Sequence, residues 1–212
     1  MTDAELTHLI LVLDRSGSMK EGGKATEAEK GVRALVDEQV ALPGRLEISV
    51  ARFDNVYELL ATAAPAVSLD RDLLQIEPRG MTALFDAVGR TVTTVGANLA
   101  DRAEEARPGR VVVLVATDGL ENASTEYTSD GLRQLIDQQT KVYGWEFMFM
   151  GTSQDAVLQA VSAGFDPSRA FFAGDSAAGV ASAYGVSSGA LRRARITGTP
   201  IEVTEDDRSD LA

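Results

Sequence analysis

The sequence predicts an α/β fold with a doubly wound, mostly parallel sheet of about six strands, one antiparallel edge strand, and helices on both faces. Residues 9–13 (LILVL) and 111–116 (VVVLVA) are apolar without alternation, which is typical of central strands buried on both faces. Between such runs, apolar residues recur with the period of a helix. Strands that alternate with helices form βαβ units, which place their strands parallel in one sheet.

The elements after the first strand are a helix and a hairpin. An amphipathic stripe begins near residue 22 and predicts a helix that ends before Pro43. Residues 46–53 then alternate as a strand, and a tight turn at 54–55 leads into a second strand at 56–61. This hairpin predicts the antiparallel strand at the edge of the sheet.

The remaining elements continue the alternation of strands and helices. In order, they are a loop with a short helix (65–79), a helix (80–99), a strand (111–116), a helix (128–142), a strand (145–150), a helix (153–164), a short strand (170–172) and a last helix (174–195). No internal repeat or linker divides the chain, so residues 1–195 are predicted to form one domain. Residues 196–212 carry several acids and are expected to be a disordered tail.

The composition limits the kinds of protein this chain can be. Its 212 residues are 44% hydrophobic, enough for one domain with a sizeable core. The net charge of −12 argues against a nucleic-acid partner, because phosphate binding needs clustered Lys and Arg. Cysteine is absent and His8 is the only histidine, so thiolate zinc sites and His-based triads have little support. Without a signal-peptide pattern or an apolar run of about 20 residues, we expect a cytoplasmic protein with no membrane partner.

Polar side chains stand where the central strands are predicted to end. Asp14, Ser16 and Ser18 lie on the loop after the first strand. Asp118 follows the second central strand, and Thr82 precedes the second long helix. Ligands bind at the carboxyl ends of the strands in open parallel sheets. Because carboxylate and hydroxyl oxygens are the hard donors that Mg²⁺ and Mn²⁺ select, the loop after the first strand is predicted to be part of a divalent-metal site.

Together these residues resemble the metal-ion-dependent adhesion site of the von Willebrand factor type A (VWA) family. That site has the pattern DxSxS, followed by a lone Thr and then a lone Asp. The matching segments here are DRSGS at 14–18, GMT at 80–82 and TDG at 117–119, in the family's order. The resemblance covers roughly residues 6–175 and implies the Rossmann-like fold of that family.

The resemblance also implies a function. It implies a Mg²⁺ ion, or alternatively Mn²⁺ or Ca²⁺, held by the hydroxyls of Ser16, Ser18 and Thr82. Asp14 and Asp118 would act directly or through bound water. One coordination position stays open for an acidic side chain of a protein partner, so the implied function is metal-dependent, non-catalytic protein binding. Intracellular members of the family often serve as adaptors in larger assemblies, including those with AAA+ ATPases.

Two other chemistries compete with this interpretation. The first is a Mg²⁺-dependent hydrolase or phosphotransferase with Asp14 as the nucleophile, but the neighbouring Arg15 and Ser16 supply no second acid or base. The second is a phosphate-binding loop at 17–26. Its spacing fails, because five residues separate Gly17 from Gly23 where the motif has four. In addition, Ala25 follows Lys24 where a hydroxyl should bind magnesium.

Some single residues also have simpler interpretations. Thr82 fits an N-cap of the second long helix as well as a metal ligand. Glu121 and Asn122 are expected on a solvated loop at the rim of the site. Because Asp14 and Asp118 repel one another without an ion, replacing Asp118 by Ala is expected to stabilise the metal-free protein slightly.

Overall fold

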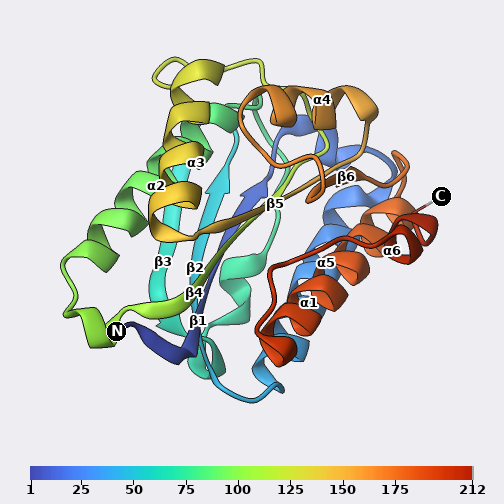
Figure 1. The fold of residues 1–212 in the computed structure, drawn as a ribbon. Helices are drawn as coiled ribbons and strands as arrows, with labels where there is room; N and C mark the ends of the chain where they lie inside the picture. Colours follow the sequence, from blue (N-terminus) through green and yellow to red (C-terminus); the bar gives the residue numbers. More distant parts are fainter. Residues whose placement is uncertain (212) are drawn as a thin grey trace.

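A six-stranded sheet in the order β3-β2-β1-β4-β5-β6 forms the centre of the molecule (Figure 1). The computed structural model describes residues 1–211. The strands are β1 Asp3–Asp14, β2 Arg45–Phe53, β3 Tyr57–Pro65, β4 Pro108–Ala116, β5 Glu146–Gly151 and β6 Ala170–Phe172. Neighbouring strands are parallel except for the β2–β3 hairpin, which is antiparallel and places β3 at the edge. The predicted fold class, including its antiparallel edge strand, is confirmed.

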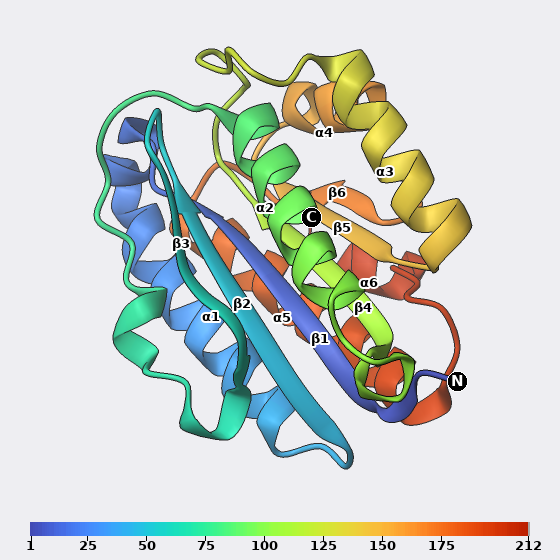
Figure 2. The same cartoon turned by 90° about the vertical axis from the view of Figure 1, so that its left-hand side faces the viewer.

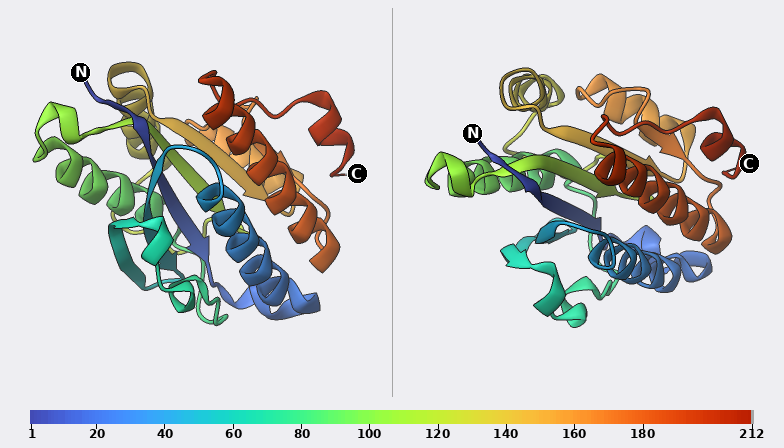
Figure 3. Two further views of the ribbon diagram at one scale, coloured as in Figure 1. Left: turned by 90° about the horizontal axis from the view of Figure 1, so that it is seen from below. Right: turned by 60° about the horizontal axis from the view of Figure 1, so that its bottom comes forward.

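Helices cover both faces of the sheet (Figures 2 and 3). One face carries α1 Lys24–Val40 and α5 Ala177–Thr197, which pack side by side. The other carries α2 Leu84–Ala100, α3 Ser129–Tyr143 and α4 Gln154–Ser162. Short 3₁₀ turns occupy Gly17–Gly23, Ala66–Ser68, Arg71–Leu74 and Glu104–Ala106. The short helix predicted within 65–79 is therefore present as two 3₁₀ turns.

Strand β1 shows why the central strands do not alternate in polarity. Leu9, Leu11 and Leu13 belong to the core beneath α1 and α5, while Ile10 and Val12 belong to the core beneath α2, α3 and α4. All five side chains are fully buried. A strand buried on both faces favours apolar residues at successive positions, and Asp14 is the first polar residue after this apolar run.

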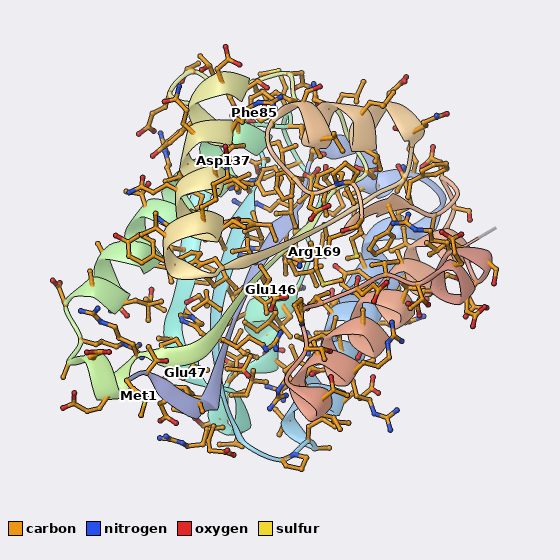
Figure 4. All side chains as sticks on the ribbon, viewed as in Figure 1. Met1, Glu47, Phe85, Asp137, Glu146 and Arg169 are labelled. Carbon is orange, nitrogen blue, oxygen red and sulfur yellow. The ribbon has the colours of Figure 1, made fainter. Side chains whose placement is uncertain are left out.

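The carboxyl ends of the parallel strands lie at one edge of the sheet. Figure 4 shows Phe85, near the start of α2, at this upper edge, with Met1 and Glu47 at the opposite end of the molecule. At that opposite end, His8 of β1 is buried and its Nε2 lies 2.8 Å from the Ser49 hydroxyl of β2. Burial, together with the positive charge of Arg102, lowers the pKa of His8 to about 3. His8 therefore stays neutral in the core, far from the polar loops.

The expected disordered tail is wrong for residues 196–211. Helix α5 continues to Thr197, and the chain then returns along the protein. Ile201 and Val203 are buried in the core beneath α5, and the backbone N–H of Ile201 donates to the Glu146 carboxylate at 2.6 Å. A last short helix, α6 Glu205–Ser209, begins with a Thr204–Asp207 capping box. Two apolar side chains are enough to anchor an otherwise acidic segment, because they bury surface that a solvated tail would expose.

Across residues 1–211, the chain contains no helix with the length and apolar character required to span a bilayer.

Candidate metal site

Asp14 and Thr117 lie side by side because β1 and β4 are adjacent parallel strands. Leu13 pairs with Ala116, so the next residue of each strand leaves the sheet at the same place. The Thr117 hydroxyl donates to one oxygen of Asp14, and the backbone N–H of Ser16 donates to the other at 2.6 Å. Burial raises the pKa of Asp14 to about 7, although these hydrogen bonds oppose the rise. The buried Asp14 carboxyl, at the start of the loop after β1, therefore changes its protonation near neutral pH.

The serines of the same loop connect Asp14 to Asp118. The hydroxyls of Ser16 and Ser18 lie 3.0 Å apart, and the Ser18 hydroxyl donates to Oδ1 of Asp118 at 2.6 Å. A hydrogen-bonded chain thus joins two loops that are separated by about a hundred residues in the sequence. The structure brings four of the predicted ligands together, namely Asp14, Ser16, Ser18 and Asp118.

Thr82 completes the predicted set from a third loop. A Cβ added at Gly119 would lie 2.8 Å from the Thr82 hydroxyl oxygen and 3.6 Å from that of Ser18. Both hydroxyls therefore face the space beside Gly119. The N-cap of α2 is Ala83, which has no capping side chain, so Thr82 is not the helix cap that its position suggested. Its buried hydroxyl is directed to the site instead.

Gly119 leaves room beside the hydroxyls of Ser18 and Thr82, so a larger residue at this position should disturb them. Gly119→Ala should weaken Mg²⁺ binding at least tenfold, because the new methyl group would press on the Thr82 hydroxyl. The folded state should lose only about 1 kcal/mol. Isothermal titration calorimetry with Mg²⁺ measures the first effect. Gly174→Ala is the matched control, since a Cβ there meets nothing within 4 Å. Unchanged Mg²⁺ affinity in Gly119→Ala would contradict this placement of the ion.

Glu121 and Asn122 hold the Thr82 loop in place, although Asn122 is exposed, as expected for a solvated loop, and Glu121 is only partly buried. The Thr82 N–H donates to the Asn122 side-chain oxygen at 2.9 Å, and the Asn122 N–H returns a bond to the Thr82 carbonyl at 3.0 Å. The Glu121 carboxylate accepts the Phe85 N–H at 2.9 Å. The start of α2 has free N–H groups and no side-chain cap of its own, so acceptors must come from elsewhere. Because the sequence pattern placed Thr82 at this cap, it held no signal for acceptors supplied by Glu121 and Asn122.

An ion-pair network centred on the buried side chains of Arg15 and Asp54 ties the loop after β1 to the β2–β3 turn. Arg15 is buried, with Nε 3.2 Å from an Asp54 oxygen and Nη1 2.9 Å from a Glu58 oxygen. Arg79 reaches the same Asp54 oxygen at 2.6 Å, and its backbone N–H donates to the Arg15 carbonyl at 2.7 Å. These contacts fix the segment before Thr82 against the segment after Asp14. No pattern in the sequence indicates this network.

Lys24 adds a positive charge to the site. Its ammonium lies 2.5 Å from Oδ2 of Asp118 and 2.9 Å from Oδ1 of Asp175. Burial acts to lower the pKa of Lys24, but the two carboxylates outweigh it and raise the pKa above its ordinary value. Lys24 thus forms ion pairs with these two carboxylates, and it is not the lysine of a phosphate-binding loop. The charge of Asp118 is already balanced, which removes the reason to expect that Asp118→Ala stabilises the metal-free protein.

The residues present fit a hard divalent ion. Within residues 1–211, no three His, Cys, Asp or Glu side chains gather as metal ligands. An ion here would instead depend on the hydroxyls of Ser16, Ser18 and Thr82, together with the carboxylates of Asp14 and Asp118. All are oxygen donors, which suit Mg²⁺, Mn²⁺ or Ca²⁺. The glycine-lined space beside two of the hydroxyls supplies room for it.

No protein-family model matches this sequence, and no curated protein matches it. Solved structures do match its fold. A von Willebrand factor type A protein from Catenulispora acidiphila has a TM-score of 0.65 at 15% identity, over 89% of this chain and 43% of that one. The vWF domain of the type V pili tip protein Mfa5 from Porphyromonas gingivalis has a TM-score of 0.64 at 13% identity, over 94% and 98%. Manganese-loaded TRAP from Plasmodium vivax has a TM-score of 0.57 at 16% identity, over 80% and 69%.

This chain spans less than half of the Catenulispora protein, and it spans nearly all of the Mfa5 domain. At these identities the likeness concerns the fold. The strand order, the parallel sheet with its single antiparallel edge strand and the helices on both faces agree with it. The chain therefore has the fold of a von Willebrand factor type A domain.

Proposed function

We propose that this chain is a non-catalytic protein-binding domain that depends on a divalent ion, Mg²⁺ or alternatively Mn²⁺ or Ca²⁺. The proposal rests on one observation. Hydroxyls from two separate loops, those of Ser18 and Thr82, converge beside Gly119, and the Ser18 hydroxyl also binds Asp118. An ion held there would keep one position for a carboxylate of a partner protein. The structural match to manganese-loaded TRAP supports the choice of a divalent ion.

The charge of the chain supports an acidic partner that binds through an ion. With a net charge of −12, the surface as a whole repels acidic proteins. A partner carboxylate therefore needs a local positive charge, which a divalent ion at this edge supplies. Met81 is 57% exposed and Leu120 is 44% exposed, and they adjoin Thr82 and Gly119. Exposed apolar side chains beside the site favour a partner whose acidic residue is flanked by apolar residues.

The alternative function, a Mg²⁺-dependent hydrolase or phosphotransferase, is less well supported. A nucleophilic Asp14 needs an oxygen free to attack, but both of its oxygens accept hydrogen bonds and the residue is only 1% exposed. The resemblance to the VWA family, whose intracellular members often serve as adaptors, also leads us to propose a cytoplasmic location and a role as an adaptor in a larger assembly, such as one with an AAA+ ATPase. Purification of the tagged full chain from its host, with and without EDTA, tests that role.

Removal of two neutral ligands tests the metal dependence. Wild-type protein should gain RT ln(1 + [Mg²⁺]/Kd) in stability, about 2.7 kcal/mol at a hundredfold excess over Kd. The Ser16→Ala, Ser18→Ala protein should stay folded but lose this gain and any EDTA-sensitive partner binding. Thermal melts with Mg²⁺ and with EDTA measure the change, and exposed Ser68→Ala in the 3₁₀ turn Ala66–Ser68 is the control. A wild-type melting temperature that ignores Mg²⁺, Mn²⁺ and Ca²⁺ at millimolar concentration would refute the proposal.

A further inference from the structure

Lys24 occupies a position that a lysine ordinarily avoids. It is the first residue of α1, where the helix dipole already presents positive charge and disfavours a cation. Its side chain is only 5% exposed, whereas lysines usually extend their ammonium into water. The ammonium of Lys24 has no acceptor for the free backbone N–H groups at the start of α1, so it cannot cap the helix. The position of Lys24 is therefore explained by what its ammonium contacts.

The main partner of that ammonium is Asp118. The Asp118 side chain is 1% exposed and that of Asp175 is 63% exposed, so water screens the second contact much more than the first. Oδ1 of Asp118 already accepts the Ser18 hydroxyl, and Oδ2 faces Lys24 without a well-aligned hydrogen bond. Lys24 thus contacts Oδ2 of Asp118, the oxygen to which the Ser18 hydroxyl does not donate.

We propose that Lys24 sets the affinity of this site for a divalent ion by competing with the ion for Asp118. The inference rests on the proposed function, because it concerns the same ion. An ammonium and a divalent ion repel each other, and both seek the carboxylate of Asp118. In the metal-free protein, Lys24 takes the part of the cation and keeps Asp118 from being a buried, unpaired charge.

The same charge also affects what the bound ion can do. Asp14 and Asp118 would balance a divalent ion if no other charge were near. The ammonium of Lys24 is buried beside them, whereas its second partner, Asp175, is 63% exposed and screened by water, so the buried part of the occupied site keeps a net positive charge. Lys24 therefore weakens the binding of the ion but leaves the bound ion attractive to an outside carboxylate.

Lys24→Met tests this by removing the charge while keeping most of the length of the side chain. We expect Lys24→Met to bind Mg²⁺ at least tenfold more tightly than wild type in calorimetric titrations at pH 8. Its melting temperature in EDTA should be lower than that of wild type, and Mg²⁺ should raise it more. Lys20→Met is the matched control, because Lys20 is exposed on the neighbouring turn and loses the same charge. If Lys24→Met does not fold, Lys24→Gln keeps a hydrogen-bond donor for Asp118 and serves the same purpose.

The outcomes separate this inference from the proposed function. If wild type binds Mg²⁺ and the folded Lys24 variant binds it equally or more weakly, the competition by Lys24 is overturned and the proposed function stands. If only the Lys24 variant binds Mg²⁺, the inference is upheld and the ion dependence of the natural chain is refuted. If neither protein binds Mg²⁺, Mn²⁺ or Ca²⁺, both are refuted.

Discussion

Asp118→Ala should destabilise the metal-free protein by about 3 kcal/mol, because it leaves the buried ammonium of Lys24 without its main partner. For a domain of this size, such a loss lowers the melting temperature by roughly 6–12 °C. The sequence alone led to the opposite expectation, a slight stabilisation through relief of the repulsion between two carboxylates. The structure changes the sign because Asp118 is one half of an ion pair.

A double-mutant cycle in EDTA checks the cause of this effect. The double variant Lys24→Met, Asp118→Ala removes both charges, so it should recover much of the stability lost by Asp118→Ala alone. Urea denaturation of the wild type, the two single variants and the double variant gives the coupling between the two residues. If Asp118→Ala proves as stable as wild type, the Lys24–Asp118 pair contributes nothing to the fold.

Mg²⁺ binding should weaken about tenfold for each pH unit below 7, because the ion requires an ionised Asp14. Burial raises the pKa of Asp14 to about 7 from its ordinary value of 3.8. Below pH 7 the ion must therefore displace a proton. Calorimetric titrations at pH 6, 7 and 8 test this directly. An affinity for Mg²⁺ that is constant over this range would show that Asp14 is ionised throughout.

The same carboxyl makes the metal-free protein less stable as the pH rises. Between pH 4 and 7 the unfolded chain has lost the Asp14 proton while the folded chain retains it, so stability falls with rising pH, by of order 4 kcal/mol in total. His8 acts in the opposite direction. Its folded pKa of about 3 lies below its ordinary value of 6.5, so it adds stability as the pH rises through that window.

Asp14→Asn separates the two contributions. The His8 effect is common to wild type and variant, so it cancels in the difference between their free energies of unfolding in EDTA. That difference should change steadily between pH 4 and 7 in the direction of a less stable wild type. A difference that does not depend on pH would contradict the raised pKa of Asp14.

The sequence by itself determined the architecture and which polar residues meet at the edge of the sheet. Uniform apolar runs such as 111–116 specify strands buried on both faces, and the helical stripes between them require parallel strands. Parallel strands end at one edge, so Asp14 and Asp118 had to lie near each other. The sequence alone predicts such features because they depend only on residue type and on the spacing of apolar residues along the chain. The tail was misread for the same reason, since its many acids conceal the burial of Ile201 and Val203.

Only the tertiary structure decided which charges meet at the site. Lys24 and Asp118 are far apart in the sequence, and nothing in the local pattern around either residue indicates the other. The same holds for Asn122 with Thr82, and for Arg15 with Asp54. Each of these pairs arises from how loops at the sheet edge pack, and buried polar groups find partners wherever packing places them. A lysine that looked like part of a failed phosphate-binding motif is therefore the counter-charge of the predicted metal site.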